Sequence, residues 1–121
     1  MDIGKTLWAI AEGYIPTGSF SETPEFVSHE ALCVLNPGKT DAELEVTLYF
    51  GDRGPAGPYR LEVPAERVTH FRFNDMKDPE PVPRDTTFAS VIRSNVPVVC
   101  QHTRLDSRDP HIAVMTTVPF H

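Results

Sequence analysis

Apolar and polar residues alternate along most of this chain. In residues 44–50 every second side chain is apolar, and most of those between are polar. A period of two is that of a β-strand with one face in a core and the other in water. The run stops at the turn signal of residues 51–55, and residues 59–63 then repeat the alternation before Pro64. We therefore predict two antiparallel strands joined as a hairpin with a long loop.

Similar short apolar runs, separated by turn-forming residues, occur from one end of the chain to the other. The expected strands cover residues 6–11, 30–35, 44–50, 59–63, 68–73, 88–93, 96–103 and 112–118. Ser94-Asn95 is expected to be a turn, and the segments 16–24 and 78–83 are expected to be loops. A short helix is the alternative for residues 85–89 or for those after Asp109. About eight short antiparallel strands at this spacing predict an all-β domain of the β-sandwich or jelly-roll type.

The composition fits that fold and narrows the function. The chain has 121 residues, which suits a single domain spanning residues 1–121, and its 12 prolines disfavour long helices. The formal net charge of −6 disfavours contact with phosphate backbones, so DNA binding is not expected. No apolar run is long enough to cross a membrane, and the N-terminal residues do not resemble a signal peptide. We therefore expect a cytoplasmic protein.

Sequence motifs for catalysis are missing. The chain has no G-x-S-x-G, P-loop, H-E-x-x-H or C-x-x-C motif. Cys33 and Cys100 lie in apolar runs and are expected to be buried, reduced thiols. We expect a protein that is not an enzyme and that has no catalytic residue, metal or cofactor. A two-His, one-carboxylate metal set of His29, Glu30 and His102 remains a lower-ranked alternative.

Polar side chains interrupt the apolar strands near their ends. By alternation His102, Arg104 and Asp106 share one face of a strand, as Arg72 and Asn74 do on another. Carboxylate, amide, guanidinium and imidazole groups bind hydroxyls or negative groups, and an indole stacks on a sugar ring. The candidate ligand-binding residues are Trp8, Glu12, His29, Glu30, Arg72, Asn74, His102, Arg104 and Asp106. The alternative for each is structural: a core tryptophan, a solvated strand end or a surface ion pair.

Six strings in this chain together carry a family resemblance. They are WAIAEGYIP at residues 8–16, FVSHE at 26–30, GPYRL at 57–61, FRFND at 71–75, FASVI at 88–92 and QHTRLDSR at 101–108. Over residues 3–108 the chain resembles the soluble sensory rhodopsin transducers. The resemblance implies a β-sandwich protomer, a homotetramer, a cytoplasmic location and, for some members, a membrane photoreceptor as partner. It also implies that members without such a partner bind a small, sugar-related molecule.

Two functions are consistent with these observations. The leading hypothesis is a non-catalytic signalling module that binds a small polar ligand, such as a sugar or sugar acid, in a pocket at the rim of the sandwich. The signal would then pass to protein partners. The alternative is a transducer of a membrane photoreceptor that acts only through protein contacts. A metal-dependent enzyme of the cupin type and a DNA-binding regulator rank below both.

Overall fold

The computed structural model describes residues 3–121, and nearly all of its regular structure is β-strand. The elements are β1 (Lys5–Gly13), β2 (His29–Asn36), β3 (Ala42–Phe50), β4 (Ala56–Val63), β5 (Arg67–Arg72), the 3-10 helix η1 (Phe73–Asp75), β6 (Phe88–Asp106) and β7 (Ala113–Thr117). The all-β fold is confirmed, and residues 16–24 and 78–83 are loops as predicted.

The predicted turn at Ser94-Asn95 is wrong. Residues 88–93 and 96–103 belong to a single strand of 19 residues, β6, so the structure has seven strands where eight were expected. Ser94 stays in register with Leu44 of β3, and the Asn95 side chain accepts a hydrogen bond from the Glu43 backbone N–H at 2.7 Å. These contacts hold the segment extended. The short helix is also elsewhere than predicted, because η1 follows β5 directly.

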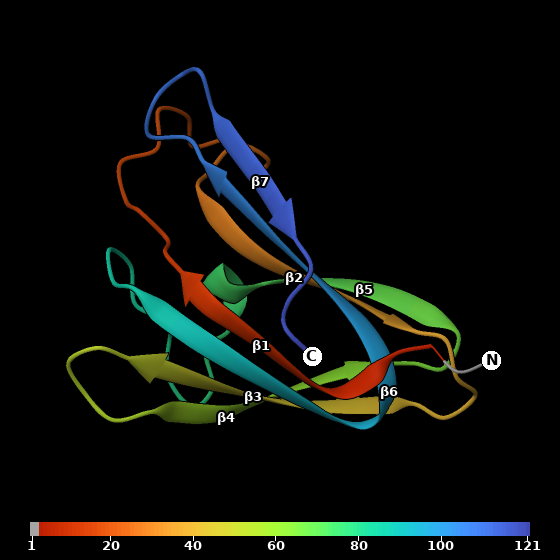
Figure 1. Cartoon of the computed structure of the whole chain (residues 1–121). Helices are drawn as coiled ribbons and strands as arrows, with labels where there is room; N and C mark the ends of the chain where they lie inside the picture. The colour runs from red at the N-terminus through yellow and green to blue at the C-terminus, as the bar shows by residue number, and fades with distance from the viewer. Residues whose placement is uncertain (1–2) are drawn as a thin grey trace.

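Strand β6 joins two layers of one strongly bent antiparallel sheet (Figure 1). Its N-terminal half pairs with β1 and β3, and β4 completes this first layer. Its C-terminal half pairs with β2 and β7, and β5 completes the second layer. Figure 1 shows the two layers diverging as the arms of a V. The inner faces of the two layers therefore face each other.

The hydrophobic core lies between these inner faces. The alternation of residues 44–50 corresponds to alternating burial, with Leu44, Val46 and Leu48 turned inward from β3. Leu32 and Val34 of β2 face them from the second layer and are also fully buried. The burial of such side chains, each worth about 1.5–3 kcal/mol, is the main force holding the layers together.

The two cysteines lie on opposite faces of the second layer. Val34 is the register partner of Cys100, so Cys33 points to the other side of the sheet. Both thiols are free. Cys100 is buried as expected, and burial raises the pKa of its thiol to about 12. Cys33 is only half-buried, and burial raises the pKa of its thiol as well.

Residues 3–121 contain no helix with the length and hydropathy needed to cross a membrane.

Candidate functional site

A fully buried carboxylate, that of Glu30, organises the main polar cluster of the molecule. Glu30 lies on β2 and points into the angle between the layers, where its register partner on β6 is Arg104. His102 lies two residues earlier on the same face of β6. Burying a charge away from water costs free energy unless the charge is paired and hydrogen-bonded. The stability of the buried Glu30 carboxylate therefore depends on its bonding partners.

Three donors satisfy the Glu30 carboxylate. His102 Nε2 bonds its Oε1 atom in a very short contact, and Arg104 Nε donates to its Oε2 atom at 2.5 Å. The backbone N–H of Tyr14 donates to the same Oε2 atom at 3.1 Å. Bonds between ionised groups are the strong ones in proteins. The Glu30 carboxylate is therefore bonded at both of its oxygen atoms.

Arg104 extends this cluster from the second layer to the first. Its Nη2 atom donates to Glu12 Oε1 on β1 at 3.2 Å. Burial by itself would lower the pKa of the Arg104 guanidinium, but its bonds to Glu30 and Glu12 outweigh burial and raise it. The Glu12 side chain is 59% exposed, in contrast with Glu30 at 0%. The outer end of the cluster is thus open to solvent.

The Asn74 side chain bonds the backbone of β2 at Glu30 and the residue just before β2. Its Oδ1 atom accepts the Glu30 backbone N–H at 3.3 Å, and its Nδ2 atom donates to the Ser28 carbonyl at 3.0 Å. Asn74 lies in η1 and not at the end of a regular strand, so the face predicted by alternation does not apply to it. It helps to position Glu30 through the backbone.

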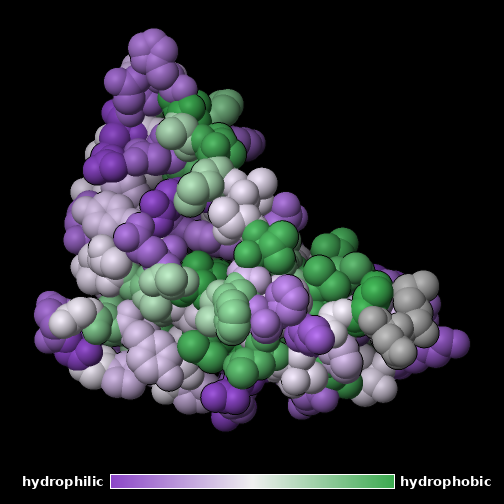
Figure 2. All heavy atoms as spheres, in the orientation of Figure 1, coloured by the Kyte–Doolittle hydropathy of each residue, from purple (hydrophilic) through white to green (hydrophobic). Residues whose placement is uncertain are grey.

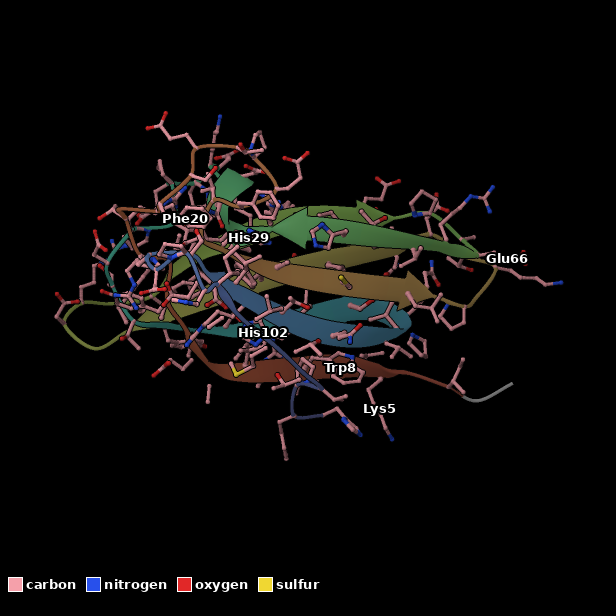
Figure 3. All side chains as sticks on the ribbon, turned by 90° about the horizontal axis from the view of Figure 1, so that it is seen from above. Lys5, Trp8, Phe20, His29, Glu66 and His102 are labelled. Carbon is pink, nitrogen blue, oxygen red and sulfur yellow. The ribbon has the colours of Figure 1, made fainter. Side chains whose placement is uncertain are left out.

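The open end of the cluster borders a groove of about 280 Å³ between β1 and β7. Residues 9–12 of β1, His102, Arg104, Met115 and residues 117–120 line it. Apart from Glu12, His102 and Arg104, the lining is apolar or a hydroxyl group. Figure 3 shows His102 between β2 and β1, above Trp8. The groove therefore places three polar side chains, those of Glu12, His102 and Arg104, against an apolar wall.

The last four residues, Val118–His121, form a strap that closes one side of this groove. The backbones of Ala9 and Phe120 exchange two hydrogen bonds, of 2.8 and 2.9 Å, which join the strap to β1. The side chains of Val118 and Phe120 are 70% and 79% exposed. Local sequence patterns do not indicate this contact, and no residue after Asp109 belongs to the predicted site.

The structure does not bring Trp8 into the groove. Trp8 is a core residue whose indole N–H bonds the carbonyls of Lys5 and Val98 at 3.1 and 3.2 Å. Its ring lies 4.8 Å from that of His121 in the strap. Trp8 therefore contacts the strap that lines the groove without lining the groove itself.

His29, Arg72 and Asp106 also lie apart from the cluster. His29 is on the opposite face of β2 from Glu30, and its Nδ1 atom bonds the Val27 carbonyl at 2.7 Å. Burial lowers the pKa of this imidazole. Arg72 donates to the Pro24 carbonyl at 2.9 Å, and the Arg108 guanidinium pairs with Asp106 at 2.6 Å and lowers the pKa of its carboxyl. The structure therefore gathers four of the nine predicted residues, Glu12, Glu30, His102 and Arg104, with Asn74 behind them.

Within residues 3–121, no group of three or more His, Cys, Asp or Glu side chains is arranged to hold a metal ion. His29 points away from Glu30 and His102, so the two-His, one-carboxylate alternative has no geometric support.

A family model described as Anabaena sensory rhodopsin transducer matches residues 3–121. The chain belongs to this transducer family. The resemblance of the six strings is thus confirmed, and the match extends past residue 108 through the strap. Membership in a family of transducers supports a non-catalytic signalling role.

Solved structures agree with that assignment. The Anabaena sensory rhodopsin transducer is 59% identical and superposes with a TM-score of 0.77, over 84% of this chain and 98% of that one. A Thermotoga maritima protein is 33% identical with a TM-score of 0.83, over 97% of this chain and 94% of that one. The comparison with curated protein sequences gave no match.

Proposed function

We propose that this transducer-family protein is a non-catalytic signalling module that binds a small polar ligand in the groove beside Glu12, His102 and Arg104. The observation that carries the proposal is the hydrogen-bonded cluster around Glu30, which opens on the groove at its Glu12 end. A hydrogen-bonded support for a few exposed polar groups is what a binding site requires.

The polar groups have bonding capacity left for a ligand. The bonds found among residues 3–121 leave Arg104 Nη1 and Glu12 Oε2 unused. Thr117 adds a hydroxyl group, and Phe120 adds an aromatic ring at the edge. Carboxylate and guanidinium groups bind neighbouring hydroxyls, while apolar walls accept the C–H face of a ring. These features support a sugar-like molecule or sugar acid.

Thermal shift measurements test ligand binding. A molecule that binds only the folded protein adds about 2.7 kcal/mol of stability at a concentration 100 times its Kd. We expect neutral sugars, amino sugars or sugar acids to raise the melting temperature of the wild-type protein. Glu12→Gln should reduce the shift given by a neutral or amino sugar, whereas Glu45→Gln, in an exposed pair with Arg60 on another strand pair, should not. The absence of a shift with every compound would overturn the proposal.

We further propose that the protein acts as a cytoplasmic homotetramer. Exposed apolar side chains support association: Leu7 on β1 and Val114 and Met115 on β7 are 46%, 63% and 46% exposed. Figure 2 shows apolar residues along β7 and near the junction of the two arms. Apolar patches of this kind often mark protein–protein contacts. Light scattering after size exclusion measures the state, and a monomer at micromolar concentration would contradict it.

The family description favours a second candidate, a transducer that contacts a membrane photoreceptor and binds no small ligand. In that case the Glu30 cluster would hold the fold or the subunits together. Glu12→Ala separates the candidates, because it removes the exposed end of the cluster and leaves the buried pair of Glu30 and Arg104 intact. A ligand site predicts lost ligand response with an unchanged elution volume, whereas a structural role predicts altered assembly. The acidic net charge of −6 makes a DNA partner the least favoured.

A further inference from the structure

The charges at the groove are unbalanced in a way that restricts the ligand. Two carboxylates, Glu12 and Glu30, share a single guanidinium, that of Arg104. Among the described residues that line the groove, the only other titratable side chain is His102, which also bonds Glu30. With a neutral imidazole these four side chains together carry one net negative charge, and with a protonated imidazole their net charge is zero. In neither state is it positive.

The positive charge of Arg104 is already balanced by two carboxylates. Its Nε atom is 2.5 Å from a fully buried carboxylate, and its Nη2 atom is 3.2 Å from Glu12. A guanidinium normally binds a carboxylate through two adjacent N–H groups. Here the Nε and Nη2 atoms, which form one such pair, bond Glu30 and Glu12. Three of the five N–H groups have no partner among residues 3–121, but the single positive charge they share is already balanced by these two carboxylates.

The residues that complete the groove supply no compensating cation. Its remaining lining comes from residues 9–11 of β1, Met115 and residues 117–120, none of which carries a charged side chain. An anion in the groove would therefore sit beside the exposed Glu12 carboxylate with no free positive partner. A volume of about 280 Å³ lies just below the usual range of small-molecule sites, so the groove suits a ligand no larger than one sugar ring.

We propose that the groove selects an uncharged or cationic hydroxyl-bearing molecule, such as a hexose or an amino sugar, and excludes the corresponding sugar acid. This inference rests on the proposed ligand-binding function and narrows its ligand class. Glu12 is the specificity-determining residue. It accepts hydroxyl or ammonium donors from the ligand and repels carboxylates.

Matched sugar sets test this selectivity. Isothermal titration would compare the hexose, the 2-amino sugar and the uronic acid of the gluco, galacto and manno series. In the wild-type protein we expect the neutral and amino sugars of at least one series to bind at least tenfold more tightly than the acid. Glu12→Gln should weaken the amino sugar about tenfold and improve the acid. Because Glu12 is 59% exposed, this variant is expected to keep the wild-type circular dichroism spectrum.

Each outcome decides a different question. A uronic acid that binds the wild-type protein as tightly as its neutral parent overturns the charge selection and leaves the ligand-binding function standing. Equal selectivity in Glu12→Gln and wild type overturns the role of Glu12. Failure of all nine sugars to bind overturns the proposed function together with this inference. Glu45→Gln serves as the matched control, since its carboxylate pairs with Arg60 away from the groove.

Discussion

Arg104→Met is expected to lower the free energy of unfolding far more than Arg60→Met, which removes an exposed ion pair with a nearly equal N···O distance. Arg104 Nε and Glu30 Oε2 are 2.5 Å apart, and the Arg60 and Glu45 side chains approach to 2.7 Å. The two pairs differ in solvent access. The Glu30 side chain is 0% exposed, whereas the Glu45 side chain is 47% exposed. Comparison of the two variants therefore isolates the effect of burying the carboxylate.

The magnitude follows from what each carboxylate loses. Without Arg104, the Glu30 charge keeps only His102 and the Tyr14 N–H, and it cannot reach water. Removal of one partner from a buried pair costs about 3–5 kcal/mol. Glu45 stays hydrated after Arg60→Met, and exposed pairs contribute about 0.2–1 kcal/mol. We expect the two variants to differ by at least about 2 kcal/mol on these scales.

Urea unfolding at pH 7, followed by the fluorescence of the single tryptophan, measures this difference. With a slope of about 1–3 kcal/mol/M, the midpoint of Arg104→Met should fall by about 1 M or more. The comparison needs equal protein concentrations, since association adds apparent stability. Equal midpoints for Arg104→Met and Arg60→Met would refute the reasoning. If Arg104→Met does not fold, Arg104→Lys, which keeps the charge but loses the fork, should give an intermediate loss.

Three further predictions concern other parts of the molecule. Because burial lowers the pKa of His29 below its usual 6.5, the unfolded chain binds this proton more readily, so stability should fall as the pH drops below about 6.5. His29→Gln should flatten that pH dependence in urea titrations, and His111→Gln, at a fully exposed imidazole, should not. Gly13→Ala would place a methyl group 2.6 Å from a buried phenylalanine ring of β6 and should cost about 1–3 kcal/mol, whereas Gly51→Ala, in open space, should change the melting temperature little. Cys33 should react slowly with a thiol reagent in the native protein, and the buried thiol of Cys100 should react only after unfolding.

The strands were predictable from the sequence where one face is buried and the other is exposed to solvent. In β3 the period-two pattern is matched position by position by burial, so the sequence alone located it. Turn propensity, by contrast, gave a wrong prediction at Ser94-Asn95, because it is a local property and the bonds that keep this segment extended come from β3. Nothing near residue 95 in the sequence indicates that Glu43 will be its partner.

The candidate site was predictable only in part, for a similar reason. Alternation correctly put His102 and Arg104 on one face, and their contact with Glu30 follows from the register of β2 with β6. The contact between Arg104 and Glu12 spans the two layers, and no local pattern specifies it. Trp8 is a candidate because an indole stacks on a sugar ring, yet in the structure it is a buried core residue.

The position of β6 in both sequence and sheet has a consequence for synthesis on the ribosome. Strands β1, β2 and β3 all need β6 as a neighbour, but β6 begins only at Phe88. Until then the nascent chain can form only the β3–β4 hairpin and the β2–β5 pair that encloses it. β1 has no strand partner until β6 has been made. The apolar faces of the early strands therefore stay open to chaperones until β6 has left the ribosome.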